Sequence, residues 1–282
     1  MTIRVLGPED ASALEAFLLE YRDSSMFLRA NSKRAGLVDN GEIYQATYAG
    51  AFHGDRLIGV AAHSWSGNVL VQAPERLEDV VRLCVQKSGR RVKGMNGPLA
   101  QVRAALRALR LENAEAPMDG DEGLYALNLD ELRLPAVLTS GQVETRAPRE
   151  DEHALLREWR LAYDIELFNA KDTPEQRDRA WSFIKTQMDR DDARIATLNG
   201  VPVSLSAFNA SLPDIVQLGG IYTPPELRGR GYAKASVAAS LLSARERGVT
   251  RAVLFTRGES AIRTYEALGF RLVGDYALVM FE

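Results

Sequence analysis

A glycine-rich turn between a predicted strand and a predicted helix offers the clearest chemistry in this sequence. It reads Arg-Gly-Arg-Gly-Tyr-Ala over residues 228–233 and continues into Lys234. Gly229 and Gly231 can adopt backbone angles that other residues avoid, so successive N–H groups can point into one concavity. A helix that starts there adds unpaired donors and the positive end of its macrodipole. The turn is therefore predicted to bind an anion, in particular a phosphate or pyrophosphate.

Two common phosphate-binding motifs do not fit this turn. A Walker loop requires Gly-Lys-Ser/Thr, but Gly231 is followed by Tyr232 and Ala233. A dinucleotide fingerprint requires a third glycine at the position where Lys234 stands. The spacing therefore excludes both a nucleoside triphosphatase loop and a Rossmann loop.

The flanking segments must position this turn. Residues 215–222 alternate and contain β-branched side chains, which predicts a strand, whereas residues 234–247 are rich in Ala and Leu and predict a helix. Residues 251–256 read as a buried strand. Ser260 could cap the helix that follows, Gly269 would end it, and a last strand is predicted near 276–281.

Two of these segments resemble conserved blocks of the GNAT superfamily, the acyl-CoA-dependent N-acetyltransferases. Residues 228–233 match the Gln/Arg-x-x-Gly-x-Gly/Ala signature. Residues 261–270, Ala-Ile-Arg-Thr-Tyr-Glu-Ala-Leu-Gly-Phe, closely match the second block, in the right order and at the right separation. The C-terminal half is therefore identified as a member of this superfamily, with acetyl-CoA as the implied cosubstrate.

The resemblance also implies roles for individual residues on the cofactor side. The strand that ends at Tyr222 would splay from its neighbour, and the pantetheine arm would fill the gap. A backbone N–H near Ile221 would polarise the thioester carbonyl. The implied cofactor-binding residues are Ile221, Tyr222 and Thr223 for the arm, and Arg228, Gly229, Arg230, Gly231, Tyr232, Ala233 and Lys234 for the pyrophosphate. Ser260 would replace an asparagine that often contacts the cofactor in this family.

Direct attack by the acceptor amine needs an acid and a base but no covalent intermediate. Tyr265 matches the family tyrosine that protonates the departing thiolate, and an unperturbed phenol has a pKa of about 10. The family places its base variably. Glu166 could accept the ammonium proton, and Asp164 could bind a cationic acceptor. Further residues that could line the acceptor pocket are Phe208, Asn209 and Gln217.

The first half repeats the same order of elements without the turn. Its predicted order is strand, helix, helix, hairpin, strand and helix, but no glycine lies between Gln72 and Arg76. We therefore expect a degenerate GNAT-like domain over residues 1–138 and a catalytic one over residues 139–282, connected within residues 132–142. The fold class is mixed α/β, with two tandem GNAT-like domains and largely antiparallel sheets.

Composition narrows the other possibilities. The chain has 282 residues, 46% of them hydrophobic, with a net charge of −3, a single cysteine and three histidines that fit no metal-ligand spacing. We therefore expect no disulfide, no metal and no nucleic-acid partner. No hydrophobic leader precedes Arg4, and no apolar run approaches the ~20 residues of a membrane span, so a cytoplasmic location is expected.

Three functional hypotheses remain open at this point. The first is an N-acetyltransferase that acts on a primary amine of a small molecule or peptide, with the C-terminal half doing the chemistry. The second is a non-catalytic acyl-CoA-binding sensor, which would not need Tyr265. The third is a nucleic-acid-binding module that uses the arginines of residues 90–110, although the acidic net charge and the lack of aromatic interleaving disfavour it. The acceptor, the acyl group and the oligomeric state are not specified by the sequence.

Overall fold

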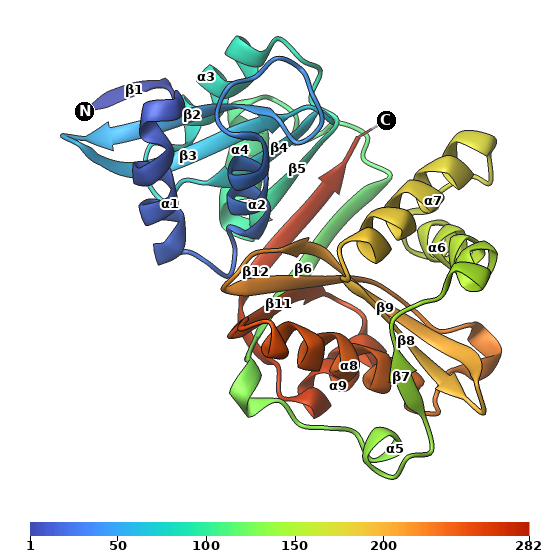
Figure 1. Cartoon of the computed structure of the whole chain (residues 1–282). Helices are drawn as coiled ribbons and strands as arrows, with labels where there is room; N and C mark the ends of the chain where they lie inside the picture. Colours follow the sequence, from blue (N-terminus) through green and yellow to red (C-terminus); the bar gives the residue numbers. More distant parts are fainter. Residues whose placement is uncertain (282) are drawn as a thin grey trace. The chain divides into compact units, whose positions relative to one another are not determined.

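The computed structural model describes residues 1–281, which fold into two compact units (Figure 1). Unit 1 comprises Met1–Leu124, Phe255–Arg257 and the chain from Leu272 onward. Unit 2 comprises Tyr125–Leu254 and Gly258–Arg271. Among the described residues, no helix combines the length and the apolar character required to cross a bilayer.

The compact units divide the chain differently from the boundary expected between residues 138 and 139. Residues 125–138 pack with unit 2, and the last strand of the chain packs with unit 1. The reason is strand pairing, because that last strand runs antiparallel to a strand of unit 1, with Ala277 opposite Gly97. The assignment of evolutionary domains to residues 1–138 and 139–282 stays a prediction.

Unit 1 contains a mixed sheet with one parallel pair. The order within this unit is β1-β2-β3-β4-β5-β12-β6. β1 with β2, β2 with β3, β3 with β4 and β5 with β12 pair antiparallel, whereas β4 and β5 pair parallel, with Asn68 to Leu70 opposite Gly94 to Asn96. The strands are β1 (Thr2–Val5), β2 (Ala46–His53), β3 (Arg56–Ser64), β4 (Asn68–Gln72), β5 (Gly94–Pro98), β12 (Arg271–Met280) and the first part of β6 (Met118–Asn128).

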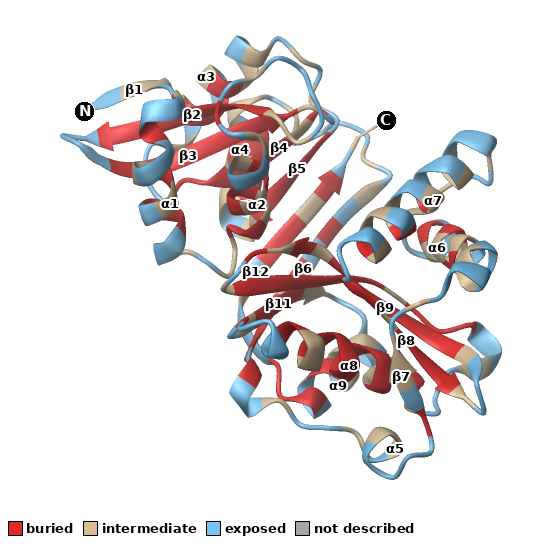
Figure 2. Ribbon diagram, viewed as in Figure 1, coloured by how far each residue is buried: buried red, intermediate tan, exposed pale blue. Residues whose placement is uncertain are grey.

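Helices cover both faces of the unit 1 sheet, which explains why β2, β3 and β4 are buried almost throughout (Figure 2). Alternate residues of one strand serve different cores, because side chains along a strand point to opposite faces. Tyr48 and Val60 pack with α1 (Ala11–Glu20) and α2 (Met26–Ala35). Ala49 and Ala61 pack with α3 (Leu77–Ser88) and α4 (Leu99–Ala108).

Unit 2 has the same construction, with its sheet order β6-β11-β10-β9-β8-β7. The parallel pair is β10 and β11, whereas β7, β8, β9 and β10 follow one another antiparallel. The prediction of mixed α/β units with largely antiparallel sheets is therefore confirmed. The strands are β7 (Glu144–Arg146), β8 (Ala193–Leu198), β9 (Val201–Ser211), β10 (Ile215–Tyr222), β11 (Arg251–Thr256) and the last part of β6.

The helices of unit 2 form two cores. Trp159 and Ile184 pack α6 (His153–Phe168) and α7 (Pro174–Asp189) against β8, β9 and the end of β10. Val237 and Leu268 pack α8 (Tyr232–Glu246) and α9 (Glu259–Leu268) against β10, β11 and the end of β6. A short helix, α5 (Ala136–Thr139), lies inside the predicted connection.

Local sequence signals explain several element boundaries and correct one. Thr173 caps α7 by accepting a hydrogen bond from Gln176 N–H at 3.2 Å, with Pro174 in the first turn. Asn199 and Gly200 both have positive φ, as a type I′ hairpin between β8 and β9 requires. The expected cap at Ser260 is wrong, because α9 begins at Glu259 after Gly258 and Ser260 lies in the first turn.

Candidate active site

The parallel pair β10 and β11 forms one wall of the site. Ile215, Val216 and Gln217 lie opposite Arg251, Ala252 and Val253. Among the described residues, the pairing of β10 with β11 ends at Gln217, although β10 itself continues to Tyr222. The later part of β10 is also irregular, since its register with β9 shifts between Gly219 and Tyr222. Gly220, inside this bulge, has φ +66°, a conformation that favours glycine. Main-chain groups at the end of β10 are therefore not committed to pairing with β11.

The phosphate turn, residues 228–234, follows β10 and a 3₁₀ turn at Pro225–Leu227. Gly229 and Gly231 have φ values of +77° and +84°, the left-handed conformation that the sequence predicted for them. Tyr232 begins α8, and no side chain caps this helix or places a carboxylate in its first turn. Its N–H donors and positive dipole end therefore suit an anion.

A cluster of buried hydroxyl groups fixes the phosphate turn to the sheet. Thr223 Oγ1 donates to Ser204 Oγ at 2.9 Å, and Ser204 Oγ lies 2.9 Å from Ser236 Oγ in the first turns of α8. Ser236 also donates to the Ala233 carbonyl at 3.1 Å. Ser204 and Ser236 were not predicted as site residues from the sequence. The sequence does contain a signal for this cluster. Ser204 and Ser206 alternate along a predicted strand, and Ser236 and Ser240 lie one turn apart on a predicted helix, so each pair can share one face.

Arg228 is held by a carboxylate from α6. Its Nη1 and Nη2 donate to the two carboxylate oxygens of Glu166 at 2.9 and 2.6 Å, and its Nε donates to the Thr223 carbonyl at 2.9 Å. The hydrogen bonds and charge of Glu166 raise the pKa of Arg228. The two side chains are 44% and 47% exposed, so the pair is solvated and can be exchanged for another anion.

Tyr265 lies on α9 with its side chain in the core of unit 2. It is 8% exposed and packs edge-on against Phe270, with ring centroids 5.8 Å apart. Burial raises the pKa of Tyr265 well above its usual value, and the neighbouring Tyr163 hydroxyl adds to the shift. The raised pKa keeps the phenol protonated, which is the form that can donate a proton.

Several other predicted residues lie in less direct positions. Ser260 is exposed, and its backbone carbonyl accepts from the Thr264 hydroxyl. Phe208 and Gln217 are buried, and Phe208 packs in the core beneath α8. Their side chains therefore present little surface to an acceptor. Asp164 is also buried and contacts Arg160 at 2.8 Å, so its charge is already balanced.

The cofactor-side residues and the acid candidate all belong to unit 2, and α6 contributes the candidate base. Ile221 and Tyr222 end β10, while Arg230 is exposed and donates to the Glu226 carbonyl at 3.3 Å. Ala233 and Lys234 are partly exposed in the first turn of α8.

The corresponding elements of unit 1 lack these features. α3 follows β4 as α8 follows β10, but its cap is Arg76 in the left-handed conformation and its first turn carries Glu78 and Asp79. The side-chain oxygen of Gln101 accepts from the Ala73 N–H at 2.6 Å, just after β4. At the end of β5, a Cβ on Gly97 would lie 2.6 Å from the Val71 carbonyl oxygen. The acidic first turn therefore disfavours an anion, and the close packing at Gly97 leaves no room for an inserted arm.

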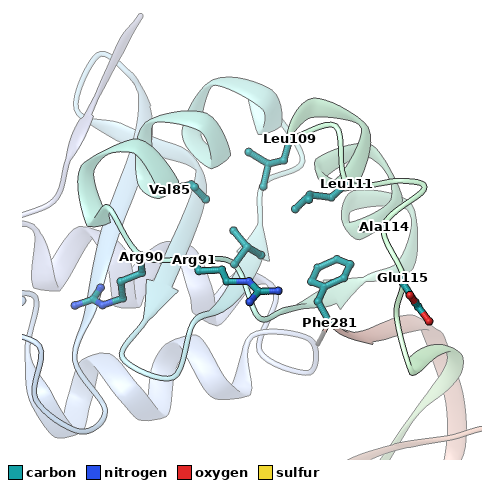
Figure 3. A pocket seen from close by; sticks show the side chains of 9 residues that line it. Val85, Arg90, Arg91, Leu109, Leu111, Ala114, Glu115 and Phe281 are labelled. Carbon is teal, nitrogen blue, oxygen red and sulfur yellow. The ribbon is translucent and has the colours of Figure 1, made fainter.

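A separate pocket of about 540 Å³ is present in unit 1 (Figure 3). None of the predicted site residues lines it. Arg91 points toward Phe281 across the pocket, whereas Arg90 points away and is bound to Asp39. Its lining residues are Val85, Arg90, Arg91, Val92, Leu109, Leu111, Ala114, Glu115 and Phe281. Across the described residues, no group of three or more His, Cys, Asp or Glu side chains is arranged to hold a metal.

Comparison with known proteins agrees with this geometry. Residues 153–270 match the model of the acetyltransferase (GNAT) family. No curated protein matches the chain. Among solved structures, a GNAT-family acetyltransferase from Colwellia psychrerythraea is 15% identical, with full coverage of both chains and a TM-score of 0.55. A GCN5-related N-acetyltransferase from Sphaerobacter thermophilus is 14% identical over 99% of this chain and 94% of its own, with a TM-score of 0.61.

A tandem GNAT protein from the clavulanic acid biosynthesis pathway is also similar in fold. It is 14% identical, covers 99% of this chain and 97% of its own, and has a TM-score of 0.55. The fold is thus of the tandem GNAT class. Within this fold, the residues that match the acetyltransferase (GNAT) family model, 153–270, contain both motifs from which a GNAT domain was predicted. A match to this family supports acyl transfer from acetyl-CoA.

Proposed function

We propose that the protein is an N-acetyltransferase that moves an acetyl group from acetyl-CoA to a primary amine, using one site in unit 2. The observation that carries the proposal is the uncapped start of α8 at the left-handed Gly231, directly after a strand pair whose parallel register stops early. This combination offers an anion site and, a few residues earlier in the chain, free main-chain groups. The anion site suits a pyrophosphate, and the free main-chain groups suit the attached pantetheine arm.

The proposed reaction is a direct displacement. The amine nitrogen attacks the acetyl carbonyl carbon, the C–S bond breaks, and the nitrogen loses a proton. A main-chain N–H near Ile221 stabilises the developing oxyanion. Tyr265 supplies a proton to the departing thiolate, and burial keeps its phenol in the protonated form that this role requires.

Glu166 has less support as the base than the sequence suggested. Both oxygens of its carboxylate accept hydrogen bonds from the Arg228 guanidinium, so neither is free to contact an acceptor amine. Binding of the cofactor pyrophosphate to Arg228 would release Glu166 for that role. A nucleic-acid-binding function is disfavoured because Arg90 and Arg103 are paired with Asp39 and Asp119.

The test is calorimetric titration of acetyl-CoA into the wild-type protein and Gly231→Asp, followed by thiol-release assays on an amine panel with wild type and Tyr265→Phe. The aspartate places a negative charge in the phosphate turn, so we expect acetyl-CoA affinity to fall by at least about 100-fold. We expect Tyr265→Phe to bind acetyl-CoA normally and to lose about 100-fold in kcat.

Three outcomes would decide against parts of this proposal. Unchanged affinity in Gly231→Asp would remove the phosphate turn from the cofactor site. Normal turnover in Tyr265→Phe would remove the phenol as the acid. Tight acetyl-CoA binding without turnover on any amine would favour the sensor, the other function consistent with an intact cofactor site.

A further inference from the structure

Arg160 lies against the main chain of β10 at its bulge. It projects from α6, and its Nη1 is 3.1 Å from the position that a Cβ would take on Gly220. Its side chain is only 14% exposed. A guanidinium can approach the strand this closely because residue 220 is a glycine. The charge therefore lies next to Gly220, the residue before Ile221. The proposed function places the thioester carbonyl near the Ile221 N–H.

Aromatic rings hold the guanidinium of Arg160 in place. It stacks over Phe183 of α7 at 3.8 Å from the ring centroid and over Tyr163 of α6 at 4.8 Å. Stacking of this kind fixes the plane of the guanidinium and leaves its edges to make hydrogen bonds. Tyr163 also acts electrostatically on Tyr265 and helps to raise its pKa. Arg160 is thus linked to the proposed acid through Tyr163.

The hydrogen-bonding capacity of Arg160 is only partly used. Its Nη2 lies 2.8 Å from Asp164 Oδ1, while Asp164 Oδ2 is taken by the Gln176 side-chain amide at 2.9 Å. The Arg160 Nε is buried and has no described hydrogen-bond partner. A guanidinium has five donors in a planar fork that matches a carboxylate. Arg160 is thus oriented by its pair with Asp164 and keeps N–H donors for which no acceptor is described.

We propose, resting on the proposed function, that Arg160 binds a carboxylate of the acceptor, so that the acceptor is an amino-acid-like amine. If the carboxylate of the acceptor binds Arg160, the amine nitrogen of the same molecule, on the adjacent carbon or the next one, would lie beside Gly220 and Ile221. There the nitrogen attacks the acetyl carbon, the C–S bond breaks, and the carboxylate itself is unchanged. Arg160 acts as a specificity-determining residue, because it recognises a part of the acceptor that does not react.

The test compares pairs of acceptors that differ only in the carboxylate. Amino acids and their carboxamides are assayed by thiol release with acetyl-CoA, using wild type, Arg160→Gln and Arg160→Lys. We expect wild type to prefer the acids by at least about 10-fold in kcat/KM. Arg160→Gln should raise KM for the acids by roughly 10- to 100-fold with a smaller effect on kcat, and leave the amides unchanged. Arg160→Lys should restore part of the preference.

Arg157 provides a matched control. It lies one turn earlier on α6, and its Nε is likewise buried without a described partner, but its side chain is 44% exposed and pairs with Glu158. Arg157→Gln should therefore leave the preference for acids unchanged. A similar loss in Arg157→Gln would mean that the helix, and not the position beside Gly220, matters.

The failure of this inference differs from the failure of the proposed function. Equal use of acids and amides by wild type, or an equal loss for both in Arg160→Gln, would overturn the role of Arg160, even if other amines are acetylated efficiently. The wild-type comparison alone decides if Arg160→Gln does not fold. Absence of acetyl-CoA binding, or of thiol release with every amine, would instead overturn the transferase.

Discussion

At the scale of single residues, Arg228 and Glu166 form the contact that most affects how the site works. Their bidentate pair joins the phosphate turn to α6, the helix that also carries Arg160 and Tyr163. Both side chains are nearly half exposed, so the pair itself contributes little to stability, about 0–1 kcal/mol. Its importance is therefore positional, since an anion that binds Arg228 competes directly with Glu166.

Asp39 in unit 1 is the residue from which we predict a pH-dependent stability. Arg90 binds both of its carboxylate oxygens at 2.5 and 2.7 Å, and this hydrogen bonding, with help from Thr47, lowers the pKa of Asp39 to about 2. In the unfolded chain the pKa is about 3.9. The unfolded state therefore binds more protons between these values, and the stabilisation by Asp39 is complete above about pH 4 and lost as the pH falls toward 2.

The variant Asp39→Asn tests this prediction. We expect its free energy of unfolding at pH 7 to be about 2 kcal/mol lower than that of wild type, and this difference to shrink between about pH 4 and pH 2. Urea unfolding at several pH values measures both. Asp79→Asn is the control, because its pair with Arg76 is 45% exposed on both sides and should contribute less than about 1 kcal/mol. A pH-independent difference for Asp39→Asn would contradict the assignment.

At the scale of elements, the sequence predicted best where local signals agree with the fold. β10 and β11 have the predicted bounds, and the two GNAT-like motifs lie at the start of α8 and on α9, as predicted. β5 and β6 were missed. β5 contains two glycines and a proline in five residues, and β6 opens with Met-Asp-Gly-Asp-Glu, so neither has strong strand propensity. Both form because partners distant in sequence pair with them, as Ala277 of β12 does with Gly97.

The candidate site shows a similar difference between local and distant signals. The glycine turn and Tyr265 are candidates that the motifs supplied, whereas the hydroxyl cluster and Arg160 became candidates only from the structure. Their roles depend on contacts between residues that are far apart in the sequence, such as Ser204 with Ser236 and Arg160 with Gly220. Periodicity places such residues on a face but does not select their partners.

The hydroxyl cluster leads to a prediction about α8. Ser236→Ala removes bonds to Ser204 and to the Ala233 carbonyl, so we expect a loss of about 1–2 kcal/mol in stability and a loss of about 3- to 10-fold in acetyl-CoA affinity. Ser240→Ala is the matched control, since Ser240 is equally buried and bonds Ser206 one turn further from the phosphate turn. It should reduce stability without reducing affinity. Equal affinity losses would show that the cluster does not act on the turn.

At the scale of the whole molecule, we predict that each chain binds one acetyl-CoA. Unit 2 offers an uncapped α8, whereas unit 1 has Glu78 and Asp79 in the first turn of α3 and Gln101 bonded to the Ala73 N–H. Calorimetric titration should give a stoichiometry near one, and Gly231→Asp should abolish the only binding phase. A second site that survives in Gly231→Asp would show that unit 1 is not degenerate.

The pairing of β12 with β5 also has a consequence for how the chain folds during its synthesis. Synthesis proceeds from the N-terminus, and domains commonly fold as they emerge. Most of unit 1 is translated within the first 124 residues, yet β5 gains its antiparallel neighbour only when residues 276–280 have been made. Until then, the β5 edge is an open template for pairing with other chains. The nascent protein therefore carries an incomplete first unit through the translation of nearly all of the second, and this interval is when it is most exposed to aggregation and most dependent on chaperones.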